Sequence, residues 1–152
     1  IVLIIGFSVI TSIGKGGNDD LILVREEQTE LARVLELGLK NVSDTTTKNT
    51  MASLQLSLTS DSTALKTLLD KRNVKIEKVV LDSKKDTDTD KALETALQNG
   101  SHDTVFVKSV NTLLTSYYNS LKAAKLDIQS NAEKELLNTA TTNLETYEST
   151  QQ

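Results

Sequence analysis

The residue types that most often do chemistry are sparse in this chain. There is a single histidine, His102, and no cysteine, which excludes disulfides, thiolate metal sites and cysteine nucleophiles. A di-iron site in a helical bundle uses Glu-x-x-His motifs on two helices, but Asn99 stands three residues before His102. No serine lies in a Gly-x-Ser-x-Gly element of the kind that exposes a hydrolase nucleophile. We therefore expect a non-catalytic protein, with His102 solvated at the start of a helix.

A short acidic segment is the only candidate for metal binding. Asp86, Asp88 and Asp90 occupy the first, third and fifth places of an EF-hand-like loop. The pattern then fails, because Lys91 stands at the glycine place and Leu97 at the final glutamate place. The segment predicts weak calcium binding or, alternatively, a solvated link whose acids favour the start of the next helix. No other metal and no cofactor are predicted.

Two further residues are candidates because of their places on predicted helices. Asp61 is a polar residue on an otherwise apolar stripe. It is either the partly exposed end of that stripe or a buried group, partnered by a hydroxyl, that fixes helix register. Tyr118 follows Tyr117 directly, and one helix face cannot bury both rings. Tyr118 is therefore a candidate contact for a partner protein.

The elements that position these residues are amphipathic helices. A repeat with alternating spacings of three and four runs through Leu21, Val24, Gln28, Leu31, Leu35, Gly38 and Val42, and all of these except Gln28 are apolar or small. This repeat predicts a helix over 19–42, and Asn18 is a suitable N-cap. A second helix is expected from Ser43 to Arg72, a short one over 88–99 and a third long one from Ser101 towards Ile128. The capping box Ser130 to Glu133 begins the fourth.

The segment between the second and third long helices has a different pattern. Residues 74–81 alternate at first and are rich in β-branched side chains, which predicts an extended, strand-like crossover. We expect an all-α four-helix bundle over 19–150, in a ferritin-like layout with its long crossover between the second and third long helices.

The first thirteen residues differ from the rest of the chain. They carry no charge, and we expect an apolar N-terminal helix here that serves membrane attachment or assembly. Its apolar members are Ile1, Val2, Leu3, Ile4, Ile5, Phe7, Val9, Ile10 and Ile13. Residues 14–18 contain three glycines and are predicted to form a flexible joint to the bundle.

Three interpretations of this segment are open. Thirteen helical residues span only about 20 Å, whereas a membrane-spanning helix needs about 20 residues. The segment is therefore the end of a span that continues upstream, a packing helix, or a buried part of a soluble core. A start on an apolar run resembles mature type IV pilins, although Ile5 stands where such pilins usually carry glutamate. That resemblance implies a filament subunit, and hence a homo-oligomer.

The charge composition indicates which classes of partner to expect. The net charge is −4 and the pI is near 5.0. The basic residues are dispersed, whereas a nucleic-acid-binding protein carries a basic stripe. Nucleic acid is therefore not an expected partner. Ser, Thr and Asn are abundant on the faces predicted to meet water, as in proteins of extracellular settings.

The order of elements over 19–148 resembles a bacterial family of envelope proteins with a ferritin-like domain of unknown function. Asp61, Asp103 and Phe106 fit that family's pattern, but Ser62 stands at a usual histidine place and Leu113-Leu114 replaces an Asp-His pair. The resemblance implies an extracytoplasmic bundle without the family's metal ligands. We expect a structural or adhesive protein of the cell surface or, alternatively, a membrane-anchored module that binds a small ligand or cation.

Overall fold

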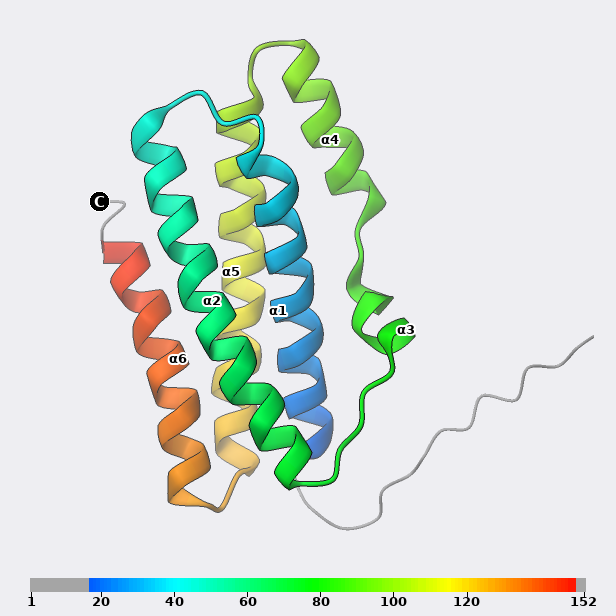
Figure 1. Cartoon of the computed structure of the whole chain (residues 1–152), viewed down its shortest axis with the longest axis vertical. Helices are drawn as coiled ribbons and strands as arrows, with labels where there is room; N and C mark the ends of the chain where they lie inside the picture. Colours follow the sequence, from blue (N-terminus) through cyan, green and yellow to red (C-terminus); the bar gives the residue numbers. More distant parts are fainter. Residues whose placement is uncertain (1–16, 150–152) are drawn as a thin grey trace, which may run out of the picture.

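The computed structural model describes residues 17–149, and all regular structure in that range is helical (Figure 1). The elements are α1 (Asn18–Leu39), α2 (Thr45–Lys71), α3 (Lys78–Leu81), the 3-10 helix η1 (Asp82–Lys84), α4 (Thr87–Gln98), α5 (His102–Asp127) and α6 (Asn131–Ser149). The all-helical fold class predicted from the sequence is confirmed for these residues. The apolar helix expected over 1–13 lies outside them.

The long helices α1, α2, α5 and α6 lie side by side around a common core (Figure 1). Helix α1 packs against α2 and α5, and α6 packs against the same two helices. The crossover from α2 to α5 runs along the outside of α1, where α3 and η1 contact that helix. It continues as α4, which packs against α5. The polypeptide enters α1 at the end of the bundle that also holds the α5–α6 connection (Figure 1).

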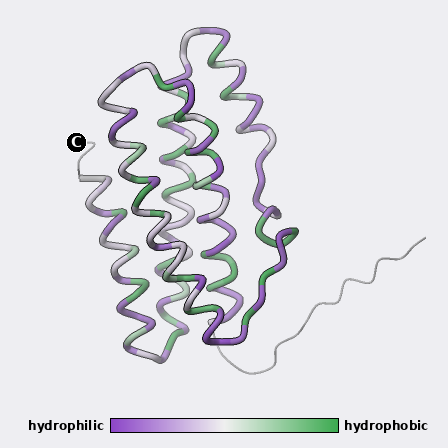
Figure 2. Tube along the Cα trace, viewed as in Figure 1, coloured by the Kyte–Doolittle hydropathy of each residue, from purple (hydrophilic) through white to green (hydrophobic). Residues whose placement is uncertain are grey.

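The core is built from the apolar stripes of the long helices, with α4 adding Leu93. Hydrophobic residues recur along each long helix, separated by polar ones (Figure 2). The largest apolar side chains that are completely or almost completely buried are Leu21, Leu31, Leu35, Met51, Leu58, Leu65, Phe106, Tyr117, Leu121, Ile128 and Leu137. Burying a leucine or phenylalanine side chain contributes about 1.5–3 kcal/mol, so these stripes are the main source of stability.

The helix starts differ in part from the sequence prediction. Gly17, with φ of 88°, precedes α1 at the N-cap position, so the prediction that Asn18 caps this helix was wrong. Asn18 is the first helical residue, and its side chain accepts a hydrogen bond from Arg72 at 2.9 Å. Helix α2 is capped by Asp44, whose carboxylate accepts from the Thr47 N–H at 2.7 Å.

The strand-like segment predicted over 74–81 is absent from the structure. Residues 74–77 have no regular structure, and Lys78–Leu81 form the short helix α3. A lone strand would leave its backbone groups without partners. Here the N–H groups of Val80 and Leu81 instead donate to the Glu77 carbonyl, at 3.0 and 3.3 Å. The extended segment was therefore wrongly predicted for residues 78–81, whereas Val74 and Ile76 do pack against the core as part of the crossover.

The upper part of the α1–α5 contact depends on a glycine. Gly38 faces the ring of Phe106, and a Cβ atom at position 38 would overlap that ring. Phe106 is fully buried, so the two helices approach closely at this level. The close approach fixes where α5 begins, and with it the position of His102 one turn earlier.

Candidate functional site

The acidic segment that is a weak calcium candidate lies at the start of α4. The Asp86 carboxylate accepts from the Thr89 hydroxyl (2.7 Å) and the Asp88 N–H (2.9 Å), and these bonds lower the pKa of Asp86. Asp88 pairs with the lysine three residues later at 2.9 Å, whereas Asp90 pairs with Arg33 of α1 at 2.6 Å. Within residues 17–149, no group of three or more His, Cys, Asp or Glu side chains is placed to hold a metal ion.

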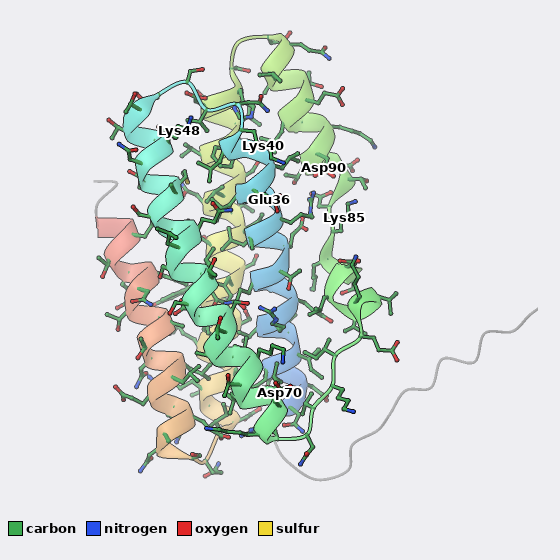
Figure 3. All side chains as sticks on the ribbon, viewed as in Figure 1. Glu36, Lys40, Lys48, Asp70, Lys85 and Asp90 are labelled. Carbon is green, nitrogen blue, oxygen red and sulfur yellow. The ribbon has the colours of Figure 1, made fainter. Side chains whose placement is uncertain are left out.

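Asp90 belongs to an ionic junction that joins α4 to α1. We define this α1–α4 junction as Glu30, Arg33, Asp86 and Asp90, of which Asp90 is labelled in Figure 3. Arg33 donates from Nε and Nη2 to the two Glu30 carboxylate oxygens, both at 2.7 Å, and from Nη1 to Asp90. The backbone N–H of Asp86 also donates to Glu30, at 3.1 Å. Glu30 is only 3% exposed, but its charge is fully partnered.

His102 was predicted to be solvated at the start of a helix, and that prediction was wrong. It is the first residue of α5, but only 5% of its surface is exposed, because α4 turns back over this end of α5. Its ring stacks on Phe106 with centroids 5.9 Å apart. His102 lines a pocket of about 580 Å³ between α1 and α4, and its Nδ1 lies 3.5 Å from the Asp103 carboxylate.

Halfway along the bundle, polar side chains from all four long helices meet in the core. We define this central polar layer as Arg25 and Gln28 from α1, Asp61 and Ser62 from α2, Tyr117 from α5 and Asn143 from α6. The Gln28 amide donates to the Tyr117 hydroxyl at 3.0 Å and to the Leu58 carbonyl at 3.5 Å. Burial raises the pKa of Tyr117, and the nearby charge of Asp61 adds to the rise. Tyr117 therefore stays protonated under ordinary conditions.

Asp61 is the buried carboxyl of this layer. Of the two interpretations from the sequence, burial is the one that the structure supports, since the residue is only 7% exposed. Its partner is an amide rather than a hydroxyl, because Asn143 Nδ2 donates to Oδ1 at 3.1 Å. The other oxygen, Oδ2, is buried without a hydrogen-bond partner among the described residues. Burial raises the pKa of Asp61, and the Asn143 hydrogen bond opposes that rise.

Arg25 is the half-buried cation at the edge of the same layer. Its Nη1 group donates to Gln28 Oε1 at 2.6 Å and to the Ser62 hydroxyl. Both acceptors are neutral, and no carboxylate in residues 17–149 forms an ion pair with this guanidinium. Burial lowers the pKa of Arg25. The layer thus contains two charged groups of opposite sign, neither of which has an ionic partner in the described chain.

No protein-family model matches this chain, and no curated protein or solved structure shows significant similarity to it.

A groove between α2 and α6 borders the central polar layer at Asn143. Its volume is about 460 Å³. Most of its lining residues carry a hydroxyl or amide group, and Asn143, the partner of Asp61, is one of them. The Tyr147 hydroxyl contacts Met51 Sδ at 3.4 Å beside it. Burial raises the pKa of Tyr147 to about 12, so the groove carries no charge of its own.

Tyr118, the predicted partner contact, lies on the outer side of the α5–α6 pair. It is half-buried, and its hydroxyl donates to the Glu145 carboxylate at 3.1 Å. The Lys122 ammonium lies over its ring, 5.2 Å from the centroid, at a distance suited to a cation–π contact. Its role in binding a partner stays a prediction.

The predicted membrane or assembly segment, residues 1–13, lies outside the described residues. Among the helices that are described, none combines the length and the apolar character needed to cross a bilayer.

Proposed function

We propose that this chain is a non-catalytic, extracytoplasmic helical-bundle protein that is anchored or assembled through its apolar segment, residues 1–13. Its role is structural or adhesive at a cell surface, and a pilin-like filament is one form of it. The observation that carries the proposal is the contrast between thirteen uncharged residues and the polar helical domain that follows, in a chain whose overall content of charged residues is 25%. The proposed fold is a four-helix bundle in a ferritin-like layout, with α3, η1 and α4 as its crossover.

The end of the bundle where the chain enters α1 is well suited to bear an attachment. Arg72 donates to Asn18 at 2.9 Å and pairs with Glu133 of α6 at 2.7 Å. This cross-link joins the start of α1 to the ends of two other helices. Gly17 also lies against Ile128 at the α5–α6 connection. A force applied through the preceding residues would thus be shared by several helices.

Vesicle flotation of the full chain tests the attachment. The full chain should float with phosphatidylcholine–phosphatidylglycerol vesicles or form filaments visible by electron microscopy. The double variant I4K/I10K should do neither, because each lysine at a membrane centre costs about 2.5–3.5 kcal/mol. A full chain that stays a dispersed monomer without vesicles bound would overturn the proposal.

A second candidate function is a membrane-anchored module that binds a small ligand. The observation that favours it is Arg25, a half-buried cation with only neutral partners among the described residues. A thermal-shift screen tests it, since a ligand that binds only the folded state raises the melting temperature. A screen of small anions, cations and neutral compounds that produces no shift would remove this function.

A further inference from the structure

A pocket beside Arg25 has the features of a binding site. It lies between α1, the last turns of α2 and the crossover segment 74–81, and its volume is about 340 Å³. Its apolar wall consists of Leu69, Val74, Ile76 and Leu81. Ligand pockets usually combine such a wall with a few convergent polar groups. In Figure 3, the labelled Asp70 marks its place at the lower end of α2.

The charged groups of this pocket favour an anion. Arg25 and Lys75 have no ion-pair partner among the described residues, whereas Lys66 pairs with Asp70 at 2.6 Å. The pocket therefore carries an excess of positive charge, although the chain as a whole has a net charge of −4. This local reversal of sign concentrates anions at the pocket.

Arg25 is held in an orientation that leaves donors available. A guanidinium has five N–H donors, and only Nη1 of Arg25 is occupied, by Gln28 and Ser62. The donors on Nε and Nη2 have no partner among the described residues. Two such donors match the two oxygens of a carboxylate. Arg33 and Arg72 bind Glu30 and Glu133 in this bidentate way.

We propose that this pocket binds a small monocarboxylate with an apolar body, of the size of hexanoate or benzoate. The carboxylate accepts from Nε and Nη2 of Arg25, and the apolar body packs on Val74, Ile76 and Leu81. A charge that is half-buried without a counter-ion loses part of its hydration, and the ligand supplies the counter-ion that the described chain lacks. The proposal gives the second candidate function its ligand class and rests on it; it does not depend on membrane attachment.

Titration of the full, ¹⁵N-labelled chain with hexanoate, in a neutral detergent, tests the proposal. Hexanoate should shift the Arg25 Nε resonance and the amides of residues 74–81 in a saturable manner. Hexanamide, which has the same apolar body without the charge, should bind at least about tenfold more weakly, since a bidentate charged pair is lost. Equal shifts with both compounds would overturn the carboxylate class while leaving a binding module. No shift with either would overturn the pocket.

Two variants and one control sharpen the test. Arg25→Gln should weaken hexanoate binding at least about tenfold, and Ile76→Asp should do the same by placing a negative charge in the pocket. Ile76 belongs to the crossover segment rather than to a long helix, so this variant remains informative if Arg25→Gln does not fold. Lys48→Gln removes a lysine at the opposite end of α2 and should leave affinity unchanged. Undiminished binding to both pocket variants would overturn the proposal.

Discussion

Two polar regions on the same helix, α1, differ in how their charges are partnered. In the α1–α4 junction, Arg33 meets both oxygens of Glu30 and one of Asp90. In the central polar layer, two turns earlier, Arg25 meets only Gln28 and Ser62. The contrast extends to their acidities, because the Glu30 hydrogen bonds raise the pKa of Arg33, whereas burial lowers that of Arg25.

The difference separates charges that are paired within the fold from charges that are still able to bind an outside partner. A buried charge is tolerated when its partner belongs to the same fold, and the junction meets that condition within the chain. The central polar layer does not, since Arg25 and Asp61 are both without ion pairs among the described residues. Layers of this kind reduce stability relative to an apolar core. The central polar layer is therefore better suited than the junction to bind a ligand.

The same substitution at the two arginines should give the largest contrast. Arg33→Met leaves Glu30, only 3% exposed, without its counter-ion, and should lower the free energy of unfolding by about 3 kcal/mol. Arg25→Met removes a charge that has no ionic partner and should cost about 1 kcal/mol or less, the loss of neutral hydrogen bonds. Urea unfolding monitored by circular dichroism measures both values. Equal losses would show that the two regions do not differ as described.

Replacing the buried carboxyl of the central polar layer should stabilise the fold. Asp61→Asn keeps an oxygen for the Asn143 amide and removes a buried charge, so the gain at pH 7 should be about 1 kcal/mol. Because burial raises the folded-state pKa of Asp61 above its ordinary value of 3.8, the folded state binds more protons than the unfolded state in the pH window above 3.8. The wild-type stability contributed by this group is therefore greatest in acid and falls as the pH rises through that window.

The difference between wild type and Asp61→Asn isolates this group from other carboxyls. Asp44 and Asp103 have lowered pKa values, due chiefly to hydrogen bonds from backbone N–H groups, and they weaken the fold in acid. Their effect is common to both proteins and cancels in the difference. The advantage of the variant should shrink towards zero near pH 3.5, where the wild-type carboxyl is protonated. An advantage that does not change with pH would contradict the buried charge.

The long helices could be predicted because their cause is local. Apolar spacing of three and four specified the stripes of α1, α2, α5 and α6, and Leu21, Leu31, Leu58 and Phe106 are buried as expected. The spacing alone did not determine which of the leucines at the edge of a stripe faces the core. On α5, Leu114 is buried whereas the adjacent Leu113 is only partly buried, and on α4 Leu97 is 48% exposed although Leu93 and Ala96 are buried. Successive residues of a helix are separated by about 100° around its axis. Either of two adjacent leucines can therefore lie at the edge of the buried stripe.

The polar regions could be predicted only in part, because their partners are distant in sequence. Asp61 interrupts the apolar stripe of α2, and that signal identified it as a candidate. Gln28 interrupts the stripe of α1 in the same way, but its role in the layer was not predicted. Glu30 and Arg33 lie off the stripe of α1 and read as surface charges. Only the packing of Asp86 and Asp90 at the start of α4, 56 and 57 residues further along the chain from their partners, buries Glu30 and partly covers Arg33. Arg25 gave no signal either, since its half-buried place depends on Ser62 and the crossover.

The smallest effect expected is at the outer edge of the α1–α4 junction. In Asp90→Asn, Arg33 keeps Glu30 and loses one contact that is about one-third exposed, so the global loss should be about 0.5 kcal/mol. Hydrogen exchange in α4 should rise more clearly, because this helix buries only Leu93 and Ala96 and depends on the junction for attachment. Asp88→Asn is the matched control, since Asp88 is 85% exposed and pairs within α4 itself. Equal exchange in the two variants would mean that apolar packing alone holds α4 in place and that the Arg33–Asp90 ion pair does not contribute to its attachment.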